Sequence, residues 1–166
     1  YSVEYTYADG TKLMHYGRTI EGCHNEFASY VHGTKGFGTF SANGHWPAPS
    51  TLYTGLTPNP KNQIWKFPAR ETNPYQDEWD DLLDAIRNDK PYNEAERGAL
   101  ASQVCNMGRM AAHTGQRVMW DDALNAKPFA PDLDKLAGFD SKAPVTADKD
   151  GFYPTPNPGI TKKSEY

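Results

Sequence analysis

The chain lacks the marks of a membrane protein or a disulfide-rich protein. No apolar stretch approaches the roughly 20 residues that a helix needs to cross a bilayer, and the first residues show no basic-then-apolar signal pattern. Its 2 cysteines, Cys23 and Cys105, lie far apart and form no CxxC pair. Two buried thiols are therefore a simpler interpretation than a disulfide, and the cysteines say little about the compartment.

A surplus of basic residues is also missing. Lys and Arg number 17 against 21 Asp and Glu, a formal net charge of −4, and no basic cluster departs from that balance. Because a surface that follows phosphates needs such a cluster, nucleic acid is not an expected partner. The 166 residues, 37% hydrophobic and 23% charged, match one ordinary globular domain. They exclude collagen, a disulfide scaffold and an acidic disordered tail.

Common catalytic motifs are absent as well. The sequence has no GxxxxGK[ST] loop for phosphates, no GxSxG nucleophile and no HExxH or Cys/His spacing for zinc. Residues 36–41 begin like GxGxxG but lack the third glycine, and residues 42–45 cannot open a helix. The 5 histidines are scattered over different elements, which favours structural roles. The pairs Asp80-Asp81 and Asp121-Asp122 are explained by a solvated helix face and a helix cap.

The first half of the chain is predicted to be rich in β-strands. It starts without Met and alternates apolar and polar residues at once, so we expect a strand at its start and interpret the chain as a fragment. A hairpin turns at Asp9-Gly10, because Asp-Gly supplies the positive φ of a tight turn, and a second reversal contains Gly33 and Gly36. The predicted strands are 1–7, 11–16, 27–31, 37–40, 52–53 and 64–67, which favours one antiparallel sheet.

A first long helix is predicted from Asn73 onward. Asn73 is a good N-cap, Pro74 suits the first helical position and Gln76 stands where a capping-box partner reaches back. The helix should run to about Asn88. Its apolar stripe is expected to cover a sheet and comprises Tyr75, Trp79, Leu82, Leu83 and Ile86.

A second helix is predicted from Asn93, with Glu96 three residues on, to Gly115, which suits a left-handed cap. It carries two non-polar rows, so we expect it to be covered on two sides, with the small row allowing a sheet or a neighbouring chain to approach closely. The large row is Leu100, Val104, Met107 and Ala111, and the small row is Gly98, Ala101, Cys105, Gly108 and Ala112. A short strand over 116–120 and a brief helix capped by Asp121 should follow.

From Pro128 on, the sequence is rich in Pro, Asp, Lys and Gly and cannot build a core of its own. It is either a disordered tail or an extended arm laid over another surface. Spaced apolar side chains favour the arm, with the predicted anchors Phe129, Leu133, Phe139, Phe152 and Tyr153.

One loop stands out as a candidate binding site. Residues 18–26 gather a cation, an imidazole, an amide and two carboxylates at one sheet edge. Such groups suit a sugar or polyol, whose hydroxyls need both donors and acceptors, and a plain polar surface loop is the equal alternative. The candidate substrate contacts are Arg18, His24 and Asn25. Lys35, in the glycine turn, can reach an anionic group, although an exposed lysine that aids solubility is the more common case.

Several blocks taken together resemble the C-terminal domain of the Gfo/Idh/MocA oxidoreductases. They are VHGTKG (31–36), NPYQDEWDDL (73–82), AIRNDKP (85–91), NEAER (93–97) and MGRMAAHTGQ (107–116) with Val118 and Trp120-Asp121. DGFYP (150–154) and PGIT (158–161) are similar to the tail of a bacterial subgroup. Each block alone is weak, but their order and spacing over nearly the whole chain make the resemblance fairly specific.

The resemblance implies an enzyme whose redox machinery lies elsewhere. In that family a preceding Rossmann domain binds NAD or NADP and supplies a catalytic lysine, and a following segment supplies an Asp and a His for proton transfer. This chain begins after all of them, so the resemblance implies no catalytic, cofactor-binding or metal-ligating residue here. It implies as partners the protein's own Rossmann domain, further copies in a homo-oligomer joined through the sheet face, and a small carbohydrate substrate.

The sequence thus predicts an α+β fold: an open, mostly antiparallel sheet of about five or six strands covered by two main helices, with an extended C-terminal arm. Residues 1–127 form the domain and 128–166 the arm. The expected compartment is the cytoplasm, or the periplasm if an export signal precedes the chain. A stand-alone carbohydrate-binding module, suggested by 13% aromatic residues, and a pure assembly domain remain alternatives. Trp79, in a predicted core stripe, weakens the first alternative.

Overall fold

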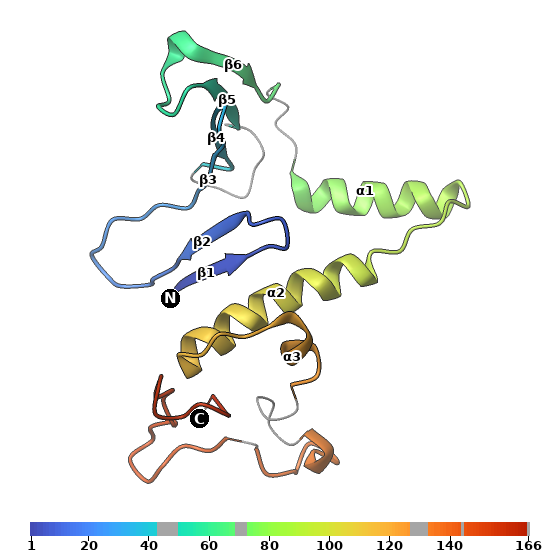
Figure 1. Cartoon of the computed structure of the whole chain (residues 1–166). Helices are drawn as coiled ribbons and strands as arrows, with labels where there is room; N and C mark the ends of the chain where they lie inside the picture. The colour runs from blue at the N-terminus through green and yellow to red at the C-terminus, as the bar shows by residue number, and fades with distance from the viewer. Residues whose placement is uncertain (43–49, 69–72, 127–132, 144, 166) are drawn as a thin grey trace. The chain divides into compact units, whose positions relative to one another are not determined.

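The computed structural model describes residues 1–42, 50–68, 73–126, 133–143 and 145–165. Within these ranges the chain forms an α+β fold of antiparallel strands and α-helices, which confirms the predicted fold class (Figure 1). The chain divides into two compact units, one made of Tyr1–Thr19 with Asn93–Tyr166 and the other of Ile20–Tyr92. None of the helices in the described ranges has the length and apolar character needed to span a membrane.

The first unit contains a hairpin, two helices and the C-terminal segment. Its elements are β1 (Ser2–Thr6), β2 (Lys12–Tyr16), α2 (Ala95–Thr114), α3 (Trp120–Leu124) and the 3₁₀ turn η3 (Leu133–Lys135). The strands pair antiparallel, with Val3 opposite His15, and the turn passes through Gly10 at φ 85°. The predicted Asp-Gly hairpin is therefore confirmed. The left-handed cap is confirmed as well, with Gly115 at φ 68°.

The predicted strand over residues 116–120 is wrong. The chain there is irregular until α3 begins at Trp120. A strand needs a neighbouring strand to complete its hydrogen bonds, whereas Gln116 turns back on the end of α2. Its backbone N–H donates to Thr114 Oγ1 at 3.3 Å and its side-chain amide donates to the Thr114 carbonyl at 3.2 Å.

The hairpin packs on α2 through the row of small residues. Tyr5 lies over Gly108, and its hydroxyl donates a hydrogen bond to the Val104 carbonyl at 3.2 Å. A Cβ at position 108 would overlap the tyrosine hydroxyl and stand 3.0 Å from Cζ, so this position requires glycine for the close approach. Burial of the phenol raises the pKa of Tyr5 above its ordinary value. The expected close contact with a sheet is thus present at Gly108, whereas Gly98 faces open space.

Replacing Gly108 by Ala is expected to destabilise the first unit by about 1–3 kcal/mol, because the added methyl group forces Tyr5 off the helix. Gly98→Ala is the matched control on the same helix and should instead stabilise the protein by about 0.5–1 kcal/mol. Urea unfolding followed by circular dichroism measures both changes. Equal stability of the two variants would contradict the close packing.

The second unit contains a four-stranded sheet and one helix. Its elements are β3 (Ser29–His32), β4 (Gly36–Phe40), β5 (Thr51–Thr54), the 3₁₀ turn η1 (Pro60–Asn62), β6 (Gln63–Lys66) and α1 (Pro74–Arg87). The strands follow one another in the order β3-β4-β5-β6, all antiparallel. Phe37 is buried in this sheet, with the rings of His32, Tyr30 and Tyr53 at 4.8, 5.9 and 6.1 Å from its own.

The predicted strands therefore form two sheets and not the single one that the alternation favoured. Period-2 alternation shows which face of a strand is apolar, but it does not say which strand lies beside it. The hairpin of β1 and β2 packs against α2, and the other four strands pair among themselves.

Helix α1 has the predicted ends. Asn73 Oδ1 accepts the Tyr75 backbone N–H at 3.0 Å, and Asn88 forms the C-cap. Gln76 does not complete a capping box, because its side chain donates to Asp80 at 2.8 Å one turn later. The predicted N-cap and C-cap positions are confirmed, whereas the predicted capping-box bond of Gln76 is not formed.

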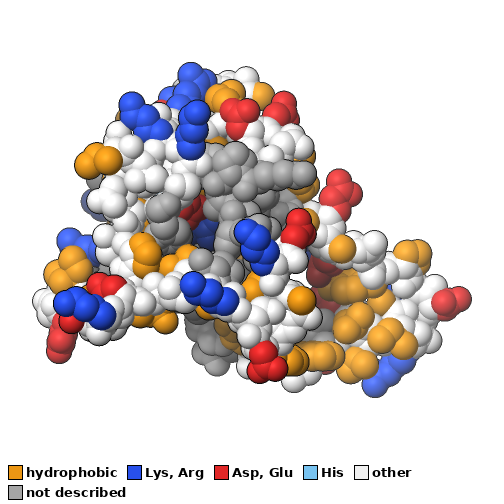
Figure 2. All heavy atoms as spheres, turned by 90° about the horizontal axis from the view of Figure 1, so that it is seen from below, with side chains coloured by type: hydrophobic (Ala, Val, Ile, Leu, Met, Phe, Trp, Pro, Cys, Tyr) orange, Lys and Arg blue, Asp and Glu red, His pale blue; other side chains and the backbone are white. Residues whose placement is uncertain are grey.

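The apolar stripe of α1 is not buried as predicted. The side chains of Tyr75, Trp79 and Ile86 are 60% exposed or more, and the strands of the same unit do not pack along the helix. The periodicity predicted the helix and its apolar face correctly, but it does not identify what covers that face. Other hydrophobic side chains also appear at the surface among charged ones (Figure 2).

The last turn of α1 is closed by Asp84. Asn88 Nδ2 donates to its carboxylate at 2.7 Å, and Lys90 Nζ donates at 2.8 Å. The hydrogen bond and the positive charge of Lys90 lower the pKa of Asp84. A carboxyl whose pKa is lowered by folding stabilises the fold above its unfolded pKa, and this contribution disappears as the pH falls through the folded value.

Lys90→Gln is therefore expected to lower the melting temperature slightly near neutral pH, where Asp84 is ionised. Below the usual titration range of an aspartate, the difference from the unchanged protein should vanish. Melting curves at both pH values test this, with Lys142→Gln as the control at an exposed lysine. A difference that persists in strong acid would show that the lysine acts through something other than Asp84.

The C-terminal segment is held differently from the way its sequence predicts. The predicted anchors Phe139, Phe152 and Tyr153 are strongly exposed, so no described part of this chain covers them. Phe129 and the side chain of Leu133 lie outside the described part. The segment is attached instead by polar groups near its end, because its sparse apolar residues cannot bury a core together. The Gly159 N–H, for example, donates to the last carbonyl of α2, that of Thr114, at 2.9 Å.

Candidate functional site

The predicted substrate contacts are divided between the two units of the chain. Arg18 belongs to the first unit, whereas His24, Asn25 and Lys35 belong to the second, and all four are exposed. Arg18, Asn25 and Lys35 make no side-chain hydrogen bond or ion pair with another residue of the described ranges. The loop's composition says which groups are available but does not fix their directions. Their role as substrate contacts therefore stays a prediction.

The polar loop 18–26 is ordered around Glu26 in its last part. His24 Nε2 lies 3.6 Å from Glu26 Oε2, and the Tyr30 hydroxyl donates a hydrogen bond to the same carboxylate. Because the carboxylate holds the phenol proton and repels a phenolate, it raises the pKa of Tyr30. This contact ties the loop to β3 at the surface of the second unit.

Glu26→Gln is expected to lower the pH at which Tyr30 ionises, since the neutral amide no longer repels the phenolate. Ring carbon chemical shifts followed by NMR through an alkaline titration measure it. Glu21→Gln, in the same loop, is the control and should leave Tyr30 unchanged. An unaltered Tyr30 titration in Glu26→Gln would contradict the contact.

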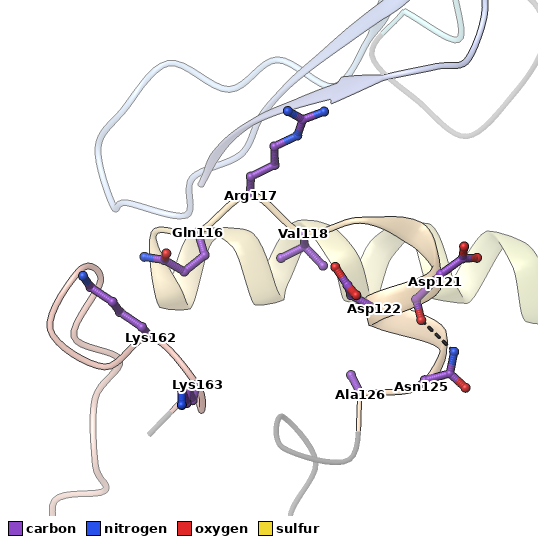
Figure 3. A pocket seen from close by; sticks show the side chains of 9 residues that line it. All are labelled: Gln116, Arg117, Val118, Asp121, Asp122, Asn125, Ala126, Lys162 and Lys163. Carbon is purple, nitrogen blue, oxygen red and sulfur yellow. Dashed lines mark hydrogen bonds between the residues drawn. The ribbon is translucent and has the colours of Figure 1, made fainter.

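A different set of polar residues lines an open groove in the first unit (Figure 3). The groove has a volume of about 720 Å³, within the range of small-molecule sites. Its walls come from the turn after α2, from α3 with the residues that follow it, and from the C-terminal segment. The lining residues are Gln116, Arg117, Val118, Asp121, Asp122, Asn125, Ala126, Lys162 and Lys163. We call it the α3 groove.

The α3 groove combines hydrogen-bond donors and acceptors. Figure 3 shows Asp122 on α3 and Lys162 and Lys163 on the C-terminal segment, with Gln116 directed toward Lys162, whereas Arg117 points away. Among the residues that the structure describes, none forms a hydrogen bond or ion pair with the side chains of Asp122, Lys162 or Lys163. A carboxylate and two ammonium groups are thus free to bind a ligand that carries hydroxyl groups and a negative charge, whereas the Gln116 amide already donates one hydrogen bond to the Thr114 carbonyl.

Sequence reasoning did not find the groove. The pair Asp121-Asp122 was explained as a helix cap, and Lys162 and Lys163 lie in a segment whose path no local pattern fixes. The two walls meet only because the C-terminal segment folds back along α2. The signal available in the sequence was the Lys162-Lys163 pair in a segment with few other cations after Lys149.

The end of that segment is held by a buried carboxylate. Glu165 is only 3% exposed, and its Oε1 lies 3.0 Å from Arg109 Nη2 and 3.1 Å from Arg109 Nε. Its Oε2 lies 2.9 Å from His113 Nδ1. An ionised carboxylate only accepts hydrogen bonds, so Nδ1 is the donor here. The other ring nitrogen of His113 lies 2.7 Å from the Tyr1 hydroxyl.

Arg109 and His113 stand four residues apart and thus on one face of α2. Their spacing lets both reach the same carboxylate from successive turns. Removing one partner of a buried ion pair costs about 3–5 kcal/mol when the other charge is left without compensation. Because Arg109 is about half exposed, its own share is reduced by solvent screening.

The described residues contain no group of three or more His, Cys, Asp or Glu side chains that could hold a metal ion. Neither cysteine is paired; Cys23 is partly buried and Cys105 is exposed, so the expectation of two buried thiols is wrong. Cys105 lies on α2, where the small row that contains it is covered only in part. No protein-family model, no curated protein and no solved structure matches the chain.

Proposed function

We propose that this chain is the C-terminal substrate-binding and oligomerisation domain of an NAD(P)-dependent oxidoreductase of the Gfo/Idh/MocA family, acting on a sugar, polyol or related carbohydrate. The order and spacing of the sequence blocks support the family, and the α+β fold is compatible with it. The cofactor and the catalytic groups belong to a preceding Rossmann domain. The proposed compartment is the cytoplasm, with the periplasm as the alternative.

The observation that carries this proposal is the apolar surface that both units leave uncovered. In the described ranges the buried hydrophobic residues are Phe37, Ala85, Met110 and Ala123. A self-contained domain of this length buries most of its apolar side chains. Large exposed side chains on α1, on the sheet and on the hairpin suit a domain that is covered by another domain and by further copies.

Chemistry in such an enzyme divides between the two domains. Hydride transfer needs the nicotinamide carbon held against the carbinol carbon while a base removes the hydroxyl proton. In our proposal the preceding domain supplies those groups, and this chain orients the hydroxyls of the substrate. The candidate contacts are Arg18, His24, Asn25 and Lys35, and the α3 groove of the first unit is a separate candidate.

A stand-alone carbohydrate-binding module is the second candidate. Trp79 is 60% exposed, so the argument that it fills a core no longer opposes this alternative. Trp65 and Trp120 are partly exposed as well. These rings lie on three different elements, β6, α1 and α3.

Cofactor binding separates the candidates. The protein encoded by the complete reading frame is expected to bind NADH or NADPH saturably and to oxidise a polyol, whereas this chain by itself should bind neither cofactor. Fluorescence titration of both proteins measures this. Saturable micromolar binding of a nicotinamide cofactor by the 166-residue chain would overturn the assignment.

Introducing a charged side chain into the apolar stripe of α1 tests whether this stripe is covered in the complete protein. Ile86→Glu or Trp79→Glu in the complete protein should cost about 1.5–3 kcal/mol of stability each, because a covered apolar side chain is replaced by a charge. Asp81→Ala, on the polar face of the same helix, is the control. Chemical unfolding and light scattering give the stability and the subunit number. If the glutamate variants match the control in both, α1 is not covered in the assembled protein.

A further inference from the structure

Residues 157–165 run back along the end of α2, and we call them the strap. Described contacts hold it near its start and at its end. Near its start, the Gly159 N–H donates to the Thr114 carbonyl at 2.9 Å, and Pro158 lies against Gly115. At its end, the buried Glu165 carboxylate meets Arg109 and His113.

Lys162 and Lys163 lie between these two attachments and form one wall of the α3 groove. A chain fixed on both sides has few backbone conformations left, so the backbone of the two lysines is kept beside the groove. Groups held in place before a ligand arrives lose less entropy when it binds. Glu165 therefore influences the groove without touching it.

The facing wall indicates what kind of ligand fits. Asp122 accepts hydrogen bonds only, and the amide of Gln116 both donates and accepts, so hydroxyl groups suit this side. The two lysines suit one anionic group on the other side. A ligand with charge along its whole length, such as a nucleic acid, would place a phosphate against Asp122 and be repelled.

We propose that the α3 groove binds a small polyol with one anionic end, a carboxylate or a phosphate, and that Glu165 is a positioning residue that holds the strap and its lysines over that ligand. The carbohydrate nature of the ligand rests on the proposed function. The attachment of the strap does not depend on the proposed function, because it is argued from the contacts of Gly159 and Glu165.

Ligand binding is tested in the complete protein. Calorimetric titrations use gluconate, glucose 6-phosphate and glucose as probes. At least one anionic probe should bind more tightly than glucose. The double variant Lys162→Gln/Lys163→Gln should weaken that binding about tenfold or more. Lys149→Gln, at an exposed lysine of the same segment, should leave it unchanged. Failure of both anionic probes to bind, or full binding by the double variant, would overturn the site.

The role of Glu165 is tested by hydrogen exchange of the strap together with affinity. Glu165→Gln should speed amide exchange in residues 157–165 and weaken binding of the anionic probe, although Glu165 does not touch the groove. Arg109→Gln, which removes the exposed partner and leaves the buried carboxylate with His113, should do the same to a smaller degree. If both variants exchange faster but bind the probe as before, Glu165 is structural and the positioning role is wrong.

These outcomes separate the two proposals. If the complete protein does not bind a nicotinamide cofactor, the oxidoreductase proposal is rejected. The titrations of the α3 groove with anionic probes would still be interpretable. If the lysine double variant binds the anionic probe as tightly as the unchanged protein, the α3 groove is rejected as the binding site. The family assignment would then still be judged by cofactor binding.

Discussion

Glu165 meets Arg109 and His113 on successive turns of α2, and this contact fixes the end of a segment that has little apolar surface of its own. A carboxylate that is almost fully removed from water is stable only with compensating charges and hydrogen bonds. The same helix holds the hairpin through Tyr5 on Gly108. The first unit is thus organised around α2. The N-terminal hairpin packs closely against this helix, and the C-terminal segment is bound to it by charged side chains.

In the described residues of the second unit, no comparable set of contacts holds the helix. Phe37 and its neighbouring rings give the sheet a small core, but α1 carries its apolar stripe uncovered. Both units therefore combine well-formed local structure with apolar faces that water would not favour. This combination is our main reason to regard the chain as part of a larger assembly.

Local signals in the sequence predicted the elements well. Asp9-Gly10 gave the hairpin, Asn73-Pro74 the start of α1 and Gly115 the end of α2, because turns and caps depend on a few neighbouring residues. The small row of α2 also predicted a close approach, which the Gly108 contact confirms. Predictions that depended on distant neighbours did less well: the single sheet and the cover of the α1 stripe within this chain.

The groove was missed for the same reason. Its walls lie about 40 residues apart in the sequence, and they meet through Glu165, a residue that no local pattern singles out. The loop 18–26 carries groups that suit a sugar, and its role in binding stays a prediction. Composition shows which chemical groups are present, and only the long-range contacts show which of them meet.

A structure of the complete protein with its nicotinamide cofactor and a polyol bound would test the central claim most directly. Our account predicts that the cofactor lies on residues that precede this chain and that the Trp79 and Ile86 side chains are covered. It would be contradicted if the nicotinamide were held by residues of this chain, or if the α1 stripe faced solvent in the full assembly.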